Sequence, residues 1–151
     1  MYDPKNEHDA CGIGFVANIK NNRSHQIVKD GLSILANLVH RGAVGADPKA
    51  GDGCGILTQI PDDFLRKVMA DAGIDLPPVG HYGVGNLFLP KNKAKREKYL
   101  AQIKDIVNGE GLEIIALRNI PVNNKGLGYS VKPTEPHHLQ MFVHAQDTDT
   151  V

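Results

Sequence analysis

The stretch EHDACGIGFVANI, residues Glu7–Ile19, places one of the two cysteines of the chain at the start of its first apolar segment. After Cys11, the larger residues Ile13 and Phe15 alternate with glycines. Apolar residues at every second position are typical of a strand, and glycines within a strand allow another backbone to approach closely. We therefore predict a β-strand over Cys11–Ile19 that is buried on both faces.

Further strands and helices are predicted downstream from apolar periodicity and from capping and breaking residues. The predicted helices cover His25–His40, Pro61 to Gly73 and Lys93–Asn108, and the predicted strands cover Ile56–Ile60, Tyr82–Leu89, Glu113–Val122 and Leu139–Ala145. This mixture favours an α+β sandwich over a doubly wound sheet. The strand at Leu139–Ala145 is expected to lack a neighbour on its outer side, because no further strand follows it in the sequence.

The composition is that of an ordinary globular chain, and 151 residues are enough for one domain with a sizeable core. Hydrophobic residues make up 41% and charged residues 23%, and 17 basic side chains balance 17 acidic ones. Nucleic-acid binding usually requires a basic excess, and the longest apolar runs are too short to cross a bilayer, so neither partner is expected. The acidic leader and the two cysteines indicate neither a secretory signal nor a disulfide framework, and the expected compartment is the cytoplasm.

The position of Cys11 allows two interpretations. A cysteine in a buried strand is usually a small packed hydrophobe. However, Cys11 follows Ala10, a small residue that would leave the intervening peptide bond accessible. Cleavage of that bond would give Cys11 a free α-amino group, and such groups have an ordinary pKa of about 7.7–8.0, which suits a general base. The amine could then take the proton of the thiol, so that one residue supplies both nucleophile and base.

Two further segments extend the pattern. The helix predicted over His25–His40 ends in His-Arg-Gly, and the segment LVHRGAVGADPKAGDGCGILTQIP, residues 38–61, holds a glycine-rich loop before the next strand. Together with EHDACGIGF, these segments closely resemble in order and spacing the start of the large subunit of glutamate synthases. The resemblance is close over residues 7–65 and looser through Val122 and the segment KPTEPHHLQMFV.

The region that this chain resembles is a class II glutamine amidotransferase domain of the N-terminal-nucleophile hydrolase type. The resemblance implies an N-terminal-nucleophile α+β fold, in which two packed sheets lie between helices. It also implies that Cys11 is the catalytic nucleophile and that residues 1–10 are a propeptide or leader. In this family the cysteine becomes the mature N-terminus, attacks the side-chain amide of L-glutamine, forms a glutamyl thioester and releases ammonia for glutamate synthesis. Leader removal could be self-catalysed, by attack of the Cys11 thiol on the Ala10 carbonyl.

Arg41 and Asp52 are predicted to support this site, since the family places their loop beside the nucleophile. Arg41 could orient the loop or the amine of Cys11, although an arginine at a helix end is also a common solvated cap. Asp52 lies between two glycines, where it could support the site or, like Asp47, form a turn by bonding its own backbone. Cys54 is expected to pack in the core, because the family usually has a small residue there. No metal site is expected, because the cysteines and histidines lack ligand spacing.

The resemblance also indicates which parts of the family's site this chain would lack. The substrate-binding arginine of the family lies in a later His-x-Arg-Tyr-Ser-Thr-like segment, and the oxyanion hole comes from a later Asn-Gly pair. Neither has a counterpart before Val151. Loss of a single oxyanion-hole donor typically costs on the order of 10²–10³ in rate. Residues 11–151 are therefore expected to be the N-terminal portion of the domain and to be inactive alone.

The remaining functional expectations concern cofactors and partners. The FMN, the iron–sulfur cluster and the synthase domains of the family are absent from this chain, so no cofactor is expected in it. The expected partners are L-glutamine and the remaining glutamate synthase domains or subunits. An alternative from a different class stays open, in which the chain is a non-catalytic truncated remnant or a partner-binding module.

Overall fold

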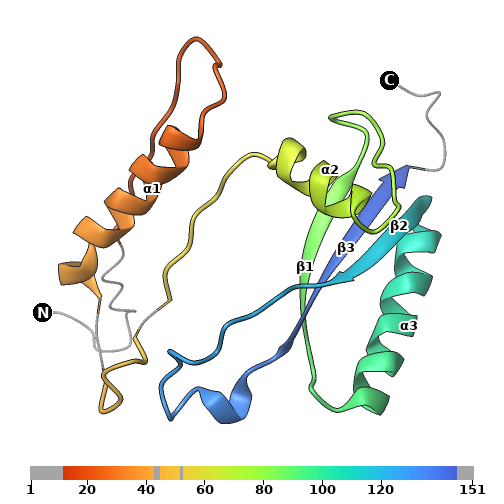
Figure 1. Cartoon of the computed structure of the whole chain (residues 1–151). Coiled ribbons are helices and arrows are strands. Elements are labelled where there is room, and N and C mark those ends of the chain that lie inside the picture. Colours follow the sequence, from red (N-terminus) through yellow and green to blue (C-terminus); the bar gives the residue numbers. More distant parts are fainter. Residues whose placement is uncertain (1–11, 43–44, 52, 146–151) are drawn as a thin grey trace, which may run out of the picture. The chain divides into compact units, whose positions relative to one another are not determined.

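A computed structural model describes residues 12–42, 45–51 and 53–145 of the chain (Figure 1). The chain divides into two compact units, one within residues 1–59 and 126–132 and the other within residues 60–125 and 133–151. The first unit contains α1 (His25–Asn37) and the 3-10 helix η1 (Val39–Arg41). The second unit contains α2 (Asp62–Ala70), β1 (Gly83–Leu89), α3 (Lys93–Gly109), β2 (Leu112–Asn119) and β3 (His137–Ala145). The 3-10 helix η2 (Lys132–Thr134) spans the point in the sequence where the chain passes from the first unit to the second.

Helix α1 is the main regular element of the first unit. It begins after Ser24, whose extended backbone (φ −152°, ψ 146°) is that of an N-cap, although its side chain makes no capping hydrogen bond. The helix ends three residues earlier than predicted. The N–H of Leu38 lies 3.1 Å from the carbonyl oxygens of both Ile34 and Leu35, so the last turn tightens and continues as the 3-10 turn η1.

The strands predicted at Cys11–Ile19 and Ile56–Ile60 are not formed among the described residues, which have no regular secondary structure in either segment. A strand requires a second backbone to pair with its N–H and C=O groups. The three strands of the described part of the chain all lie within the second unit. The burial predicted for Cys11–Ile19 is wrong as well, since Ile13 is 93% exposed and Phe15 is 89% exposed. The alternating pattern therefore identifies sequences suited to a strand, but it does not supply their partners.

The second unit is built on an antiparallel sheet with the strand order β1-β3-β2. The last predicted strand is confirmed as β3, but it is the central strand of the sheet. Phe142 of β3 pairs with Val84 of β1 on one side and with Ala116 of β2 on the other. The expectation that this strand lacks an outer neighbour is thus wrong, because the two earlier strands come to lie on either side of it.

The core of the second unit forms where α2 covers one face of this sheet (Figure 1). Leu65 and Met69 are four residues apart, so both project from one side of α2, and both are buried. They pack with Phe142, which has no exposed area. The core cluster consists of Leu65, Met69, Leu76, Tyr82, Ala116 and Phe142.

A partly buried polar network fixes α2 to the segment that leads into β1. Asp62, in the first turn of α2, accepts hydrogen bonds from Tyr82 Oη at 2.7 Å and from Arg66 Nη2 at 3.0 Å. Arg66 also donates to the carbonyl oxygens of Leu76 (2.7 Å) and Pro77 (2.9 Å). Burial and the hydrogen bond to Asp62 raise the pKa of Tyr82 from 10.0 to about 12. The network therefore depends on a neutral tyrosine beside an ionised aspartate.

Helix α3 connects the two edge strands. The side chain of Asn92 accepts a hydrogen bond from the Lys95 N–H at 3.0 Å and so caps the first turn, as N-terminal asparagines often do. Gly111 follows the helix with φ 72°, a conformation that favours glycine, and the chain turns directly into β2. Helix α3 then lies beside β2 (Figure 1). Of the helices within the described residues, none is long and apolar enough to span a membrane.

We expect Tyr82→Phe to lower the free energy of unfolding by about 1–3 kcal/mol, because the buried carboxylate of Asp62 loses a donor. The raised pKa means that the tyrosine contributes its stability in full below about pH 10 and that this contribution is lost as the pH rises towards 12. Urea unfolding at neutral pH and at high pH measures both effects.

Tyr99→Phe is the matched control, because Tyr99 is 44% exposed. Equal stabilities of the two variants at neutral pH, or the same loss of stability in wild type and Tyr82→Phe at high pH, would contradict this account.

Candidate functional site

The residues predicted to form the site lie largely outside the described part of the chain. Cys11 and Asp52 are not among the described residues, and neither is the side chain of Arg41. The backbone of Arg41 ends the 3-10 turn η1, directly after α1. The structure thus describes the surroundings from which the site would be built, and the roles of the three residues stay predictions.

The sequence neighbour of Cys11 lies against the end of α1. A Cβ atom placed on Gly12 would come within 2.8 Å of Leu38 Cδ2, and one on Gly14 would come within 2.5 Å of Ile34 Cγ2. Both distances are shorter than real side-chain contacts, so a larger residue at either position would force the neighbouring side chain to shift, and glycine avoids this. Leu38 lies three residues before Arg41 in the sequence. The glycine segment therefore runs beside the turn that ends in Arg41.

A second glycine contact brings the segment after the glycine-rich loop to the same helix. A Cβ atom on Gly31 of α1 would come within 2.9 Å of Ile56 Cδ1. Ile56 follows Cys54 and Gly55, at the end of the loop that contains Asp52. The three sequence segments recognised as motifs thus meet at α1, through contacts in which glycine lets the neighbouring side chains approach closely.

Asp47 anchors the glycine-rich loop to a distant segment of the same unit. It is 5% exposed, and its Oδ2 accepts hydrogen bonds from the backbone N–H and the hydroxyl of Ser130, at 2.9 and 2.8 Å. Its Oδ1 accepts from the backbone N–H of Lys49 at 3.1 Å. A Cβ atom on Gly128 would come within 2.8 Å of the carboxyl carbon. The carboxylate is therefore held by two segments that are 83 residues apart.

The electrostatics of this contact favour an ionised carboxylate. Hydrogen bonds from the Ser130 backbone lower the pKa of Asp47 below its ordinary value, against the opposing effect of burial, and the Ser130 hydroxyl and Lys49 act in the same direction. From the sequence, Asp47 is predicted only as a turn former. The bond to the Lys49 N–H confirms that local role, but the contact with Ser130 was missed. The closely spaced Gly126 and Gly128 were the available signal, and their partner could not be identified from spacing.

Cys54 does not occupy the core position predicted for it. The structure describes it as a free, exposed cysteine. A Cβ atom on either flanking glycine, Gly53 or Gly55, would meet no atom within 4 Å, so the surrounding segment is loosely packed. The prediction is wrong because a small residue at this position in the family does not by itself bury the side chain, and residues 53–60 form no regular element that would cover it.

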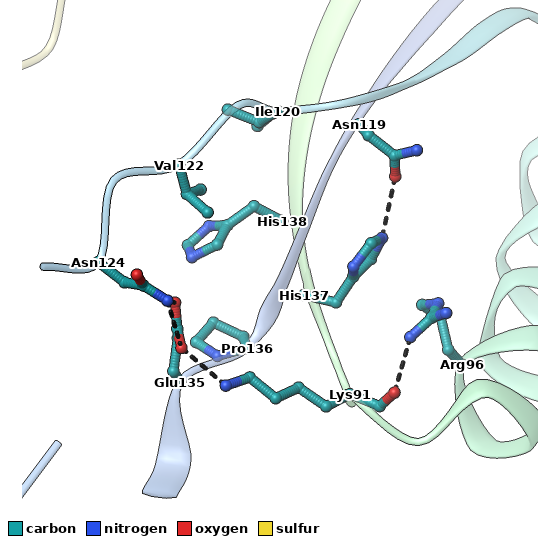
Figure 2. Close-up of a pocket in the computed structure, with 10 residues that line it drawn as sticks. All are labelled: Lys91, Arg96, Asn119, Ile120, Val122, Asn124, Glu135, Pro136, His137 and His138. Carbon is teal, nitrogen blue, oxygen red and sulfur yellow. Dashed lines mark hydrogen bonds and ion pairs between the residues drawn. The ribbon is translucent and has the colours of Figure 1, made fainter. Parts of the chain in front are cut away.

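A pocket of about 500 Å³ lies in the second unit, lined by residues from the start of α3, the end of β2 and the start of β3 (Figure 2). All of the residues that line it belong to the second unit. Among the residues that the structure describes, no group of three histidine, cysteine, aspartate or glutamate side chains could hold a metal ion. The pocket is thus distinct from the motifs gathered at α1.

Comparison with known protein families gives a match to glutamine amidotransferases class-II over residues 11–150. Because this match covers nearly the whole sequence, the chain belongs to the class II glutamine amidotransferase family. The observed mixture of helices with a small antiparallel sheet is consistent with such a domain.

The relatives specify the branch of the family. The chain is 42% identical over 145 residues to the large chain of glutamate synthase [NADPH] from Bacillus subtilis, and 43% identical over 145 residues to glutamate synthase [NADH] from Saccharomyces cerevisiae. It is 39% identical over 151 residues to the chloroplastic ferredoxin-dependent glutamate synthase 2 of Arabidopsis thaliana. These alignments cover 96%, 93% and 100% of this chain, but only 9%, 7% and 9% of the relatives. The predicted resemblance to glutamate synthases is confirmed, and the chain spans less than a tenth of the relatives it matches.

We expect Gly14→Ala to loosen the first unit, because the new methyl group would clash with Ile34 of α1. Overpacking of this kind typically costs about 1–3 kcal/mol, which corresponds to roughly 5- to 150-fold faster amide exchange where exchange follows opening of the unit. Hydrogen exchange of a peptide from α1, followed by mass spectrometry, measures the effect. Gly53→Ala is the control, since its methyl group would meet no atom within 4 Å. Equal exchange in the two variants would show that Gly14 does not pack on α1.

We expect the contact between Asp47 and Ser130 to be lost in acid. Because folding lowers the pKa of Asp47 below 3.8, its stabilising contribution is present above about pH 3.8 and is lost as the pH falls below that value. The amide proton chemical shift of Ser130, measured by NMR, should titrate in this acidic range. Asp47→Asn should remove that titration, whereas Asp75→Asn in the second unit should leave it intact. A Ser130 shift that titrates equally in all three proteins would exclude Asp47 as its cause.

Proposed function

We propose that this chain carries the nucleophile of a glutaminase that hydrolyses the side-chain amide of L-glutamine and supplies ammonia for glutamate synthesis. The observation that supports this function most directly is the extent of the family match, which begins at Cys11. A domain whose first residue is the nucleophile would begin there. Residues 1–10 are then a propeptide or leader, and residues 11–151 are the N-terminal portion of the amidotransferase domain.

The proposed chemistry requires a free amine and a thiol on one residue. The α-amino group of the processed Cys11 takes the thiol proton, and the resulting thiolate attacks the side-chain carbonyl carbon of glutamine. The ammonium then returns the proton to the departing nitrogen, so that ammonia leaves and a glutamyl thioester remains. Water attacks the thioester with the amine again acting as base. Glutamate is released, and the thiol is regenerated.

The contacts at α1 support a role for Arg41 near this nucleophile. Gly12, the next residue after Cys11, lies against Leu38, and Arg41 follows Leu38 by one helical turn. We propose that Arg41 orients the loop or the amine of Cys11. Asp52, in the loop that Asp47 anchors, is proposed to support the same site.

The oxyanion hole and the arginine that binds the carboxylate of the substrate are proposed to come from other parts of a glutamate synthase. Preorganised oxyanion donors usually account for a large share of the rate in acyl transfer. The chain alone is therefore expected to be inactive. The N-terminal-nucleophile sandwich would be completed by strands that pair with residues 12–18 and 53–60, whose described residues include the exposed Ile13 and Leu57. FMN and iron–sulfur chemistry would belong to the other domains.

A non-catalytic, partner-binding module is the second candidate, and the same exposed segments favour it. Ile13, Phe15 and Leu57 are at least 89% exposed, and large apolar side chains gathered in water often mark an interaction surface. In this alternative the chain would bind other glutamate synthase domains or subunits without turnover. The cytoplasm remains the proposed compartment, although the name of the Arabidopsis thaliana relative describes it as chloroplastic.

Ammonia release tests the catalytic proposal. We expect no release from the chain alone, and release when it is assembled with the downstream segment of the Bacillus subtilis large chain. Cys11→Ser should lower the rate of the assembled protein by a factor on the order of 10³ or more, because no other group supplies the nucleophile. Cys54→Ser should leave the rate unchanged, since Cys54 is exposed and has no role in the proposed chemistry.

Three outcomes would count against the proposal. Ammonia release that survives Cys11→Ser would exclude Cys11 as the nucleophile. An active sample whose intact mass retains residues 1–10 would exclude the amine as the base. An assembled complex that releases no ammonia would assign the chain to the non-catalytic alternative.

A further inference from the structure

Asp47 is a buried charged residue to which the chemistry proposed for Cys11 gives no role. Asp47 and Asp62 are the two charged residues that are buried among those that the structure describes, and Asp62 serves to fix α2. Asp47 lies instead in the glycine-rich loop, six residues after Arg41. Burial of a charge is costly unless hydrogen bonds replace the lost water. A buried aspartate in this loop therefore needs an explanation beyond the formation of a local turn.

The carboxylate of Asp47 is held by more contacts than a turn requires. The bond from the Lys49 N–H to its Oδ1 is the one that a turn-forming aspartate makes with its own segment. Its Oδ2 accepts two further hydrogen bonds from Ser130, one from the backbone and one from the hydroxyl. Gly128 leaves space for the carboxylate, since a Cβ atom there would lie 2.8 Å from the carboxyl carbon. The segment at Gly128 and Ser130 is thus shaped to receive this one side chain.

The two ends of the glycine-rich loop are fixed near α1. At its start, the N–H of Gly42 donates a hydrogen bond of 3.1 Å to the carbonyl oxygen of Val39 in the turn η1. At its end, Ile56 lies against Gly31 of α1. The residues between these points are rich in glycine, which has more backbone freedom than any other residue. The conformation of the loop between its fixed ends therefore depends on contacts that restrain its middle.

Asp47 supplies such a contact. Of residues 45–51, Asp47 and Lys49 alone have polar side chains, and Lys49 is exposed. The side chain that ties this part of the loop to a distant segment is therefore that of Asp47. Hydrogen bonds from the Ser130 backbone lower the pKa of Asp47, so the carboxylate stays ionised at neutral pH and keeps its donors. The restraint on the loop is thus in place under the conditions in which a glutaminase would work.

From these contacts we propose that Asp47 is a positioning residue of the glutaminase site. It holds the loop on Ser130 and acts through the loop on Arg41 and Asp52, which lie six residues before it and five residues after it. It makes no contact with the substrate. The inference rests on the proposed function, in which Arg41 and Asp52 support the nucleophile Cys11. It makes a segment far downstream, at Ser130, a part of the framework of that site.

Glutaminase kinetics of the chain assembled with the downstream segment of the Bacillus subtilis large chain test this inference. We expect Asp47→Ala to lower kcat by about 10- to 100-fold, because a misplaced supporting group costs rate of this order. KM should change by less than about threefold, since the groups that bind the substrate are proposed to come from other parts of a glutamate synthase. Rates are divided by the fraction of Cys11 that L-glutamine protects from iodoacetamide, so that unfolded protein does not count as a loss of kcat.

Three further variants separate positioning from a general loss of stability. Asp47→Asn should recover most of kcat, because its amide oxygen still accepts the hydrogen bonds of Ser130. Lys49→Ala is the matched control. It removes a charge from an exposed side chain of the same loop, keeps the backbone N–H that binds Asp47, and should retain the kcat of wild type. Ser130→Ala should lower kcat less than Asp47→Ala does, since the backbone donor of Ser130 remains.

Double-mutant cycles with Arg41→Gln and with Asp52→Asn show whether Asp47 acts through these residues. If it does, Asp47→Ala should lower kcat less when Arg41 or Asp52 has already been replaced, whereas independent effects would multiply. An unchanged kcat in Asp47→Ala, an equal loss in Lys49→Ala, or independent effects with both Arg41 and Asp52 would overturn the inference.

A second measurement keeps the inference apart from the proposed function. An assembled protein that releases no ammonia counts against the function, and the inference is then decided on the chain itself by the rate constant for alkylation of Cys11 with iodoacetamide. Cys54 is replaced by serine in every sample. Asp47→Ala should slow the alkylation about tenfold, because a guanidinium placed near a thiol favours the reactive thiolate. Equal rate constants in Asp47→Ala and Lys49→Ala would overturn the inference here as well.

Discussion

Backbone pairing with β3 is the interaction on which the ordered β-structure of this chain depends. Within residues 12–42, 45–51 and 53–145, neither β1 nor β2 pairs with another strand, and the two are joined because β3 lies between them. The insertion of β3 also brings Phe142 beneath α2, where it becomes the centre of the core. Where the described chain provides no such partner, as in residues 12–18 and 53–60, sequences equally suited to a strand remain without regular structure.

The two units are consequently stabilised in different ways. The second unit has a compact apolar core together with the partly buried network of Asp62, Arg66 and Tyr82. In the first unit, α1 contains no buried residue, and its neighbours are held by glycine contacts and by the carboxylate of Asp47. The motifs that carry the family resemblance thus lie in the unit with less hydrophobic burial. A site built on the first unit would therefore depend for much of its order on other segments that pack against this unit.

Apolar periodicity and capping residues within one segment predicted the helices and most of the strands well. They did not predict which distant segments of the chain contact each other. The start of α1 at His25 and of α3 at Lys93 follow from caps and from periodicity that lie within one segment. The central place of β3 and the contact between Asp47 and Ser130 each depend on a partner far along the chain. The exposure of Cys54 likewise cannot be read from its own segment, because burial depends on what other segments pack against it. For the candidate site, the sequence motifs led to the family, whereas the roles of the three predicted residues rest on atoms that the structure does not describe.

The contact between Asp47 and Ser130 has a consequence for biosynthesis. During translation Asp47 is synthesised long before Ser130, and β1 and β2 are synthesised before β3, the strand that lies between them. Neither unit can therefore close until residues 126–145 have left the exit tunnel. During that interval the early apolar segments are exposed to water, and nascent chains in this condition are natural clients of chaperones. Translation speed through this late stretch would then influence how much of the chain reaches its folded form.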